Sequence, residues 1–245
     1  MQDAIRKEAP LTETEARRIW ASSVYRWHAY AYEGFMTCEE LEEITIEWQR
    51  TDNEDTIASV HITRIPYEGN PRTQWLFEKH RNMKTWMDDE SGDLAVIAEC
   101  IFDTDTGITR EIRKQLTEND LYYVGKIHVI PELRDSGFGT YILKNLHQIL
   151  AVHAKEANPV VMLIPSAIEY ERPYEHHSEE WHKMTDRLTA WYRRNGFVCV
   201  KGYYGKDAFV LKESLSWLKF KKIQANMKRV AANTHQNDST NDKPN

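Results

Sequence analysis

The chain has 245 residues, of which 41% are hydrophobic and 29% charged, a balance typical of a globular protein with a sizeable core. No apolar run approaches the roughly 18 residues of a transmembrane helix, and the first residues lack the apolar stretch of a secretory signal. Membrane-spanning and secreted classes are therefore not expected, and we predict a cytoplasmic protein with no membrane partner.

The net charge of −6 is unevenly distributed. From Ser214 to the C-terminus, six basic and two acidic residues give +4, so the first 213 residues carry −10. An acidic body repels the phosphates of nucleic acids and attracts cationic ligands. Nucleic-acid binding is therefore disfavoured, although the basic C-terminal segment leaves contact with an acidic partner or RNA open.

The cysteines and histidines form no metal-binding pattern. Cys38, Cys100 and Cys199 are widely separated without a CxxC pair, as expected of reduced thiols in the cytosol. Residues 175–182 include three histidines, but their spacing matches no standard metal site. We therefore expect neither a metal nor a disulfide.

The N-terminal part is predicted to begin with a helix. Apolar residues recur at helical spacing behind Thr12 and Glu15, which fit a capping box. Two later segments alternate apolar and polar residues around a polar turn, which predicts a β-hairpin. In order, the predicted elements are a helix at 11–35, an acidic helix or charged face at 38–43, hairpin strands at 44–50 and 56–65, a loop with some helix at 66–92, and a buried strand at 93–102.

The C-terminal part alternates strands and helices. In order, we predict a polar segment with a short helix at 104–120, a strand at 121–130, a helix at 138–156, a central strand at 159–165, an acidic loop at 165–178, a helix from Ser178 to Asn195, and closing strands at 197–204 and 207–213. A basic helix at 214–231 and a disordered tail at 232–245 are predicted to follow.

Two glycines stand where the strand 121–130 gives way to a helix. Glycine at a helix start costs roughly 1 kcal/mol relative to alanine, so it needs a reason. Gly137 and Gly139 would let backbone N–H groups approach an anion at the helix N-terminus, and Arg134 adds positive charge. A P-loop is excluded because GxxxxGK[ST] is absent, and residue 142 is Ile where GxGxxG needs glycine.

The spacing Arg134-x-x-Gly137-x-Gly139, after a strand ending at Pro131, resembles the acyl-CoA motif of the GCN5-related N-acetyltransferase (GNAT) superfamily. The segment WYRRNGF at 191–197 is similar to the closing helix and strand of that family. This resemblance implies an α/β (α+β) fold with a mixed, mostly antiparallel sheet and helices on both faces. The GNAT-like domain would span 1–213, with its core at about 93–213 and an N-terminal helix and hairpin at 11–66.

The resemblance also implies how acetyl-CoA, the expected co-substrate, would bind. Pantetheine would pair with a bulged, splayed strand, and the pyrophosphate would lie on amides of the glycine turn. The residues implied to bind the co-substrate are His128, Val129, Ile130, Arg134, Asp135, Ser136, Gly137, Phe138, Gly139 and Thr140. An amide near Val129 would polarise the thioester carbonyl, and Tyr192 would protonate the departing thiolate.

Three positions depart from the family pattern. The usual strand base maps to Tyr123 or Gly125, and His128 has the other strand parity unless the bulge shifts it. Asp135 places a carboxylate in the turn where many members have glycine. Thr185 replaces an asparagine that contacts pantetheine in many members. The base is therefore left open between a water relay, His128 and a carboxylate of the acidic loop.

The acceptor is predicted to be an amine. The long segment 166–181 holds five glutamates and one arginine, so it is either a solvated loop or a rim that attracts a cationic amine. A small molecule and a protein lysine or N-terminus both remain open, as does a homodimer. Direct acetyl transfer in a ternary complex is the favoured function. The alternative is a non-catalytic acyl-CoA-binding or protein-interaction module with the same fold.

Overall fold

The computed structural model describes residues 12–32, 38–67, 83–90, 92–154, 158–166, 178–202, 207–212 and 214. The strands are β1 (Val24–Tyr32), β2 (Cys38–Gln49), β3 (Thr56–Ile65), β4 (Leu121–Val129), β5 (Val160–Leu163), β6 (Phe197–Lys201) and β7 (Asp207–Leu211). The helices are α1 (Glu13–Ala21), α3 (Met83–Glu90), α4 (Gly92–Ala98), α5 (Gly107–Gln115), α6 (Phe138–Ala154) and α7 (Glu179–Arg194).

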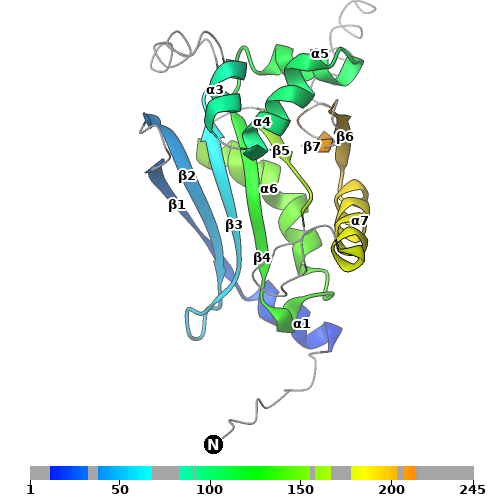
Figure 1. Cartoon of the computed structure of the whole chain (residues 1–245). Coiled ribbons are helices and arrows are strands. Elements are labelled where there is room, and N and C mark those ends of the chain that lie inside the picture. The colour runs from blue at the N-terminus through cyan, green and yellow to red at the C-terminus, as the bar shows by residue number, and fades with distance from the viewer. Residues whose placement is uncertain are drawn as a thin grey trace, which may run out of the picture.

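The seven strands form one sheet in the order β1-β2-β3-β4-β5-β7-β6 (Figure 1). Every neighbouring pair is antiparallel except β4 and β5, which are parallel. The expected mixed, mostly antiparallel α+β sheet is therefore confirmed.

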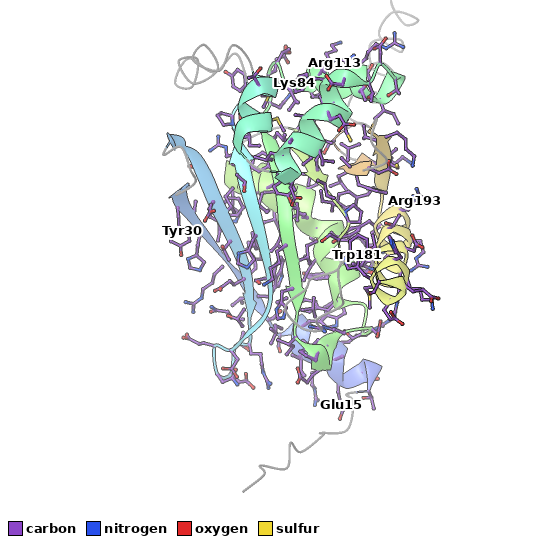
Figure 2. All side chains as sticks on the ribbon, in the orientation of Figure 1. Glu15, Tyr30, Lys84, Arg113, Trp181 and Arg193 are labelled. Atoms are coloured by element: carbon purple, nitrogen blue, oxygen red, sulfur yellow. The ribbon has the colours of Figure 1, made fainter. Side chains whose placement is uncertain are left out.

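Helices cover both faces of the sheet, as expected. One face packs its buried side chains against α3, α4 and α5, and the other packs against α1 and α6, with α7 contributing Trp191 and Tyr192. Side chains fill the space between sheet and helices, whereas Tyr30 on the outer strand β1 is 58% exposed (Figure 2). No described helix is long and apolar enough to cross a membrane.

The predicted helix over 11–35 is wrong from Ser22 to Tyr32, and residues 33–35 lie outside the described part of the chain. The Thr12–Glu15 capping box is present, but α1 ends at Ala21 and the chain continues as β1 from Val24 to Tyr32. Aromatic and β-branched residues favour strands, and pairing with β2 satisfies their backbone groups. The acidic run predicted as a helix or a charged face is part of β2, so the helix alternative is wrong there too.

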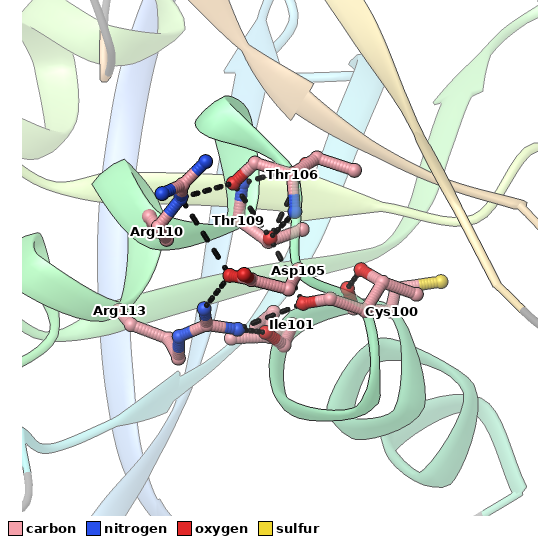
Figure 3. Close-up of polar contacts among 8 residues, drawn as sticks. Cys100, Ile101, Asp105, Thr106, Thr109, Arg110 and Arg113 are labelled. Carbon is pink, nitrogen blue, oxygen red and sulfur yellow. Dashed lines mark hydrogen bonds and ion pairs between the residues drawn. The ribbon is translucent and has the colours of Figure 1, made fainter.

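The predicted strand at 93–102 is also wrong. These residues form α4 and a π-helical turn, Glu99–Asp103. A short continuous apolar run does not distinguish a buried strand from a buried helix. The turn is closed by Arg113 of α5, whose Nη1 donates to the carbonyls of Ile101 (2.6 Å) and Thr104 (2.9 Å) (Figure 3).

The other predicted helices and strands that fall on described residues are confirmed. The hairpin is β2–β3, the short helix at 104–120 is α5, and the strand, helix and strand that follow are β4, α6 and β5. Ser178 caps α7, and β6 and β7 close the sheet. Most of the predicted acidic loop and the predicted elements from 215 to 245 lie outside the described residues.

A buried ion pair joins the start of β4 to the strands beside it. Asp120 is 2% exposed and accepts hydrogen bonds from Arg64 Nε (2.7 Å) and from the backbone N–H of Tyr67 (2.9 Å). Arg64 Nη1 also donates to Glu42 of β2 (2.8 Å), and the Asp120 carbonyl accepts from Val160 N–H at the start of β5 (3.1 Å). The network therefore holds β2, β3, β4 and β5 in register at one end.

We predict that Arg64→Met lowers the free energy of unfolding by about 3 kcal/mol, because it removes the Arg64 guanidinium from the buried Asp120 carboxylate. Urea unfolding measures the change. Arg50→Met is the matched control, since Arg50 pairs with the exposed Asp52, and it should cost less than about 1 kcal/mol. Equal losses in the two variants would contradict the prediction.

Candidate functional site

The pairing between β4 and β5 stops halfway along β4. Leu121–Val124 pair with Val160–Leu163, and no described residue pairs with β4 beyond Val124 on that side. On its other side, β4 stays paired with β3 as far as Val129. The second half of β4 therefore presents an open backbone edge, 125–129, to the gap between the two strands.

A bulge at Gly125 marks the point where the strands part. His61 of β3 pairs with Lys126, and the next residue, Ile62, pairs with Val124, so Gly125 is an extra residue. The bulge exchanges the two faces of β4. Even-numbered residues face the α6 side before it, and Ile127 and Val129 do so after it.

This exchange settles which face His128 occupies. After the bulge, residues 126 and 128 lie on the same face of β4 as Tyr123 does before it. His128 is half-buried and lies opposite Ser59 of β3. The shift in parity that would bring His128 to the face of Tyr123 is therefore present.

Val129 directs its backbone polar groups into the open edge. The N–H of Ile130 donates to Ile57 O of β3 (3.1 Å), and successive residues of a strand alternate in direction. The N–H and C=O of Val129 consequently point away from β3. Its carbonyl accepts from Nε of Arg134 at 2.9 Å.

The turn between β4 and α6 contains two left-handed residues. Asp135 has φ of 59° and Gly137 has φ of 88°. Ser136 Oγ donates to Leu133 O at 2.6 Å and receives a long hydrogen bond, 3.4 Å, from Phe138 N–H. The first helical bond of α6 runs from Tyr141 N–H to Gly137 O, so the N–H groups before Tyr141 have no partner within the helix.

The two glycines of the turn have different structural reasons. Gly137 needs the left-handed backbone, and a Cβ there would meet nothing within 4 Å. At Gly139 a Cβ would lie 3.1 Å from Cζ2 of Trp191 on α7. Trp191 Nε1 also donates to Thr140 Oγ1 at 3.2 Å. Gly139 therefore allows α7 to pack against the start of α6, beside its predicted role toward an anion.

Asp135 points outward from the turn. Its carboxylate is 86% exposed and lies 3.3 Å from Nη2 of Arg187 on α7. It does not bond to Arg134, whose side chain is directed at Val129. A left-handed Asp is tolerated because its short side chain is less crowded there than a β-branched one.

Tyr192 lies near the end of α7, where its ring contacts Trp191 and Phe197 at centroid distances of 4.8 and 5.5 Å. Burial raises the pKa of Tyr192 to about 12. The phenol therefore keeps its proton at neutral pH and is available as a donor.

Thr185 lies two helical turns before Tyr192, on the same side of α7. Its Oγ1 is buried and has no hydrogen-bond partner among the described residues. A buried hydroxyl without a partner costs about 1–3 kcal/mol, so such a group calls for an explanation, of which a bound water or ligand is one.

Tyr123 occupies the position where the sequence offered no obvious base. It is buried, and its hydroxyl donates to Oδ2 of Asp93 at 2.5 Å. Burial, this hydrogen bond and the nearby Tyr192 together raise the pKa of Tyr123 far above its usual range. Asp93 was missed because its segment was predicted as a strand, although an acid in the first turn of a helix is a recognised start signal.

No protein-family model and no curated protein sequence matches the chain. Among solved structures, it is similar to a GNAT-family acetyltransferase from Listeria monocytogenes 4b F2365, with 11% identity, 68% of this chain and 62% of that chain covered, and a TM-score of 0.33. It is also similar to a polyamine N-acetyltransferase of Drosophila melanogaster that forms N-acetylagmatine, with 12% identity, coverage of 68% and 73%, and a TM-score of 0.33.

The chain spans less than two thirds of the length of the Listeria protein. At a TM-score of 0.33, the chemistry of this protein has to be inferred from the residues of its own site.

We predict that Gly139→Ala is coupled to Trp191, whereas Gly137→Ala is not. The methyl group at 139 would press on the indole, so Trp191→Leu should relieve part of its cost, with a coupling of at least about 0.5 kcal/mol in a double-mutant cycle. Gly137→Ala should cost about 1 kcal/mol through backbone strain, whatever residue stands at 191. Urea unfolding of the wild type, the three single variants and the two double variants measures both cycles, and equal couplings would contradict the assignment.

Proposed function

We propose that the protein is an N-acetyltransferase that moves an acetyl group from acetyl-CoA to a primary amine by direct attack in a ternary complex. The observation that carries the proposal is the open edge of β4, which leads directly to the glycine turn before α6. An extended amide chain fits the first feature and a pyrophosphate fits the second.

The open edge of β4 suits pantetheine. Its amides would pair with the N–H and C=O of Val129, as an added strand does, with the flanking residues His128 and Ile130 lying along the ligand. The buried hydroxyl of Thr185 would hydrogen-bond to the same pantetheine. In the free protein, Arg134 Nε donates a hydrogen bond to the Val129 carbonyl. A pantetheine N–H bonded to this carbonyl would replace that hydrogen bond, and the guanidinium could then turn toward the pyrophosphate.

The start of α6 suits the pyrophosphate. N–H groups within residues 137–140 have no helical acceptor, and the helix dipole favours negative charge at this end. Residues 134–136 would contribute through the backbone and through the Arg134 side chain. No metal is required in this scheme, because amides and a guanidinium provide the positive potential.

The reaction needs few protein groups. The amine nitrogen attacks the thioester carbonyl carbon, a C–N bond forms, and the C–S bond breaks as CoA leaves. Val129 N–H is directed into the gap and would stabilise the developing oxyanion. The Tyr192 phenol would give its proton to the leaving thiolate.

One observation favours a second candidate, a non-catalytic module that binds acyl-CoA or a protein partner. Asp135 places an exposed carboxylate in the turn that would hold the pyrophosphate, which weakens anion binding unless Arg187 neutralises it. The acceptor rim predicted at 166–181 lies largely outside the described residues, so the amine is proposed as a class only.

We predict that acetyl-CoA binds with a Kd in the micromolar range and that a panel of primary amines then releases free CoA thiol. Calorimetry and a thiol assay measure the two steps. No binding at tens of micromolar would contradict both the transferase and the acyl-CoA-binding form of the module, whereas binding without thiol release would favour the module.

Thr185→Val sharpens this binding test. It should weaken acetyl-CoA binding at least threefold and stabilise the free protein by about 1 kcal/mol, because it removes a buried hydroxyl without a partner. Thr109→Val is the matched control, since that buried hydroxyl is hydrogen-bonded to Thr104 and Thr106 and its loss should destabilise the protein. Unchanged affinity in Thr185→Val would remove Thr185 from the donor site.

We predict that Tyr192→Phe lowers kcat more than tenfold at pH 7 with little change in acetyl-CoA affinity. With a pKa of about 12, the phenol stays protonated and active at every pH below that value and is lost only above it. The wild type should therefore show no loss of kcat from Tyr192 between pH 7 and pH 9. An unchanged kcat in the variant would refute the role of Tyr192 as the acid.

A further inference from the structure

Tyr123 stands at the mouth of the gap between β4 and β5. It belongs to the next-to-last residue pair that joins the two strands, and the bulge at Gly125 follows two residues later. A Cβ on Gly125 would lie 3.5 Å from Cε1 and 3.9 Å from Cζ of Tyr123. The phenol end of the ring therefore leans over the bulge, toward the open half of the strand.

The direction of the phenol hydrogen decides what Tyr123 can do. The hydroxyl donates to Oδ2 of Asp93 at 2.5 Å, so its hydrogen is committed to the carboxylate. A phenol oxygen also has lone pairs that accept. With its hydrogen directed at Asp93, Tyr123 can only accept from a further group at its oxygen.

Asp93 is placed where a proton could leave for the solvent. It lies in the first turn of α4, and it is exposed where Tyr123 is buried. A proton that reaches this carboxylate can therefore pass to water. Among the described residues, the titratable groups that act on the Tyr123 phenol are Asp93 from α4 and Tyr192 from α7.

We infer that Tyr123 and Asp93 form the proton relay for the attacking amine, with the Tyr123 oxygen receiving the amine hydrogen and the Asp93 carboxylate accepting the proton. This inference rests on the proposed acetyl transfer and fills the role of base that the sequence left open. Tyr123 is the group that touches the amine, and Asp93 acts through it.

The relay balances. As the amine nitrogen bonds to the carbonyl carbon, its proton moves to the Tyr123 oxygen, and the Tyr123 proton moves to Asp93. The C–S bond then breaks, and the thiolate takes a proton from Tyr192. Water accepts the proton from Asp93 and returns one to Tyr192, so the products are the acetamide and CoA thiol.

The test compares the full-length wild type with Asp93→Asn and Tyr123→Phe. Asparagine can still accept the Tyr123 hydrogen bond but cannot accept the proton. We expect Asp93→Asn to lower kcat at least tenfold at pH 7, with the Kd of acetyl-CoA within twofold of the wild type. The deficit should shrink toward pH 9.5, because hydroxide then takes the proton in place of the carboxylate.

Two further variants separate the relay from a structural role. Tyr123→Phe should lose as much activity as Asp93→Asn, and the double variant should fall within threefold of either single one, because both act in one path. Asp105→Asn is the matched control. Asp105 is 73% exposed in the same helical layer, where it pairs with Arg113 (Figure 3). The kcat of this variant should stay within twofold of the wild type.

The outcomes are distinguishable from those of the proposed function. If the wild type binds acetyl-CoA but releases no thiol with any amine, the proposed transfer fails, and the relay fails with it. If the wild type turns over and Asp93→Asn stays within twofold of it, the relay alone is overturned. A deficit of constant size from pH 7 to pH 9.5 also overturns it, since misplacement of a helix would slow the reaction equally at each pH.

Discussion

The candidate site depends on one constraint, the end of the pairing between β4 and β5 after Val124. A strand that stayed paired would bury the backbone groups of 125–129 in the sheet and leave nothing for a ligand to bind. The bulge at Gly125 coincides with this end, and bulges commonly increase strand twist and redirect side chains near active sites. One extra residue in β4 thus accounts for the face of residues 126 and 128, and its position coincides with the start of the open edge.

Helix α7 packs against the turn that follows β4 and against the start of α6. Trp191 rests against Gly139 and donates to Thr140, and Arg187 reaches Asp135, so α7 touches the turn and the start of α6 at three points. Thr185 and Tyr192 lie on the same helix. A change in the packing of Trp191 would therefore move the turn and these two side chains together, which couples the proposed anion site to the proposed acid.

The sequence predicted those elements whose signals are local. The glycine turn, the α6 helix and the Ser178 cap of α7 each follow from residues near in the chain, and the structure contains all three. The error at β1 had another origin, because its aromatic residues fit a helical stripe as well as a strand, and pairing with β2 decided between them. Asp93 could not be found, since its partner Tyr123 is 30 residues away and the contact exists only once α4 packs on the sheet.

In the proposed site two tyrosines have opposite roles, and their surroundings distinguish them. Tyr123 donates its hydrogen to a carboxylate, so its oxygen can accept, whereas Tyr192 packs against Phe197 in a partly buried aromatic setting that keeps its proton in place. An acid and a base of the same residue type can work side by side only if the environment separates them in this way. The different roles of the two tyrosines depend on α4, because the Asp93 carboxylate reaches Tyr123 from the first turn of that helix. The helical layer formed by α3, α4 and α5 is therefore part of the proposed site as well as a cover for the sheet.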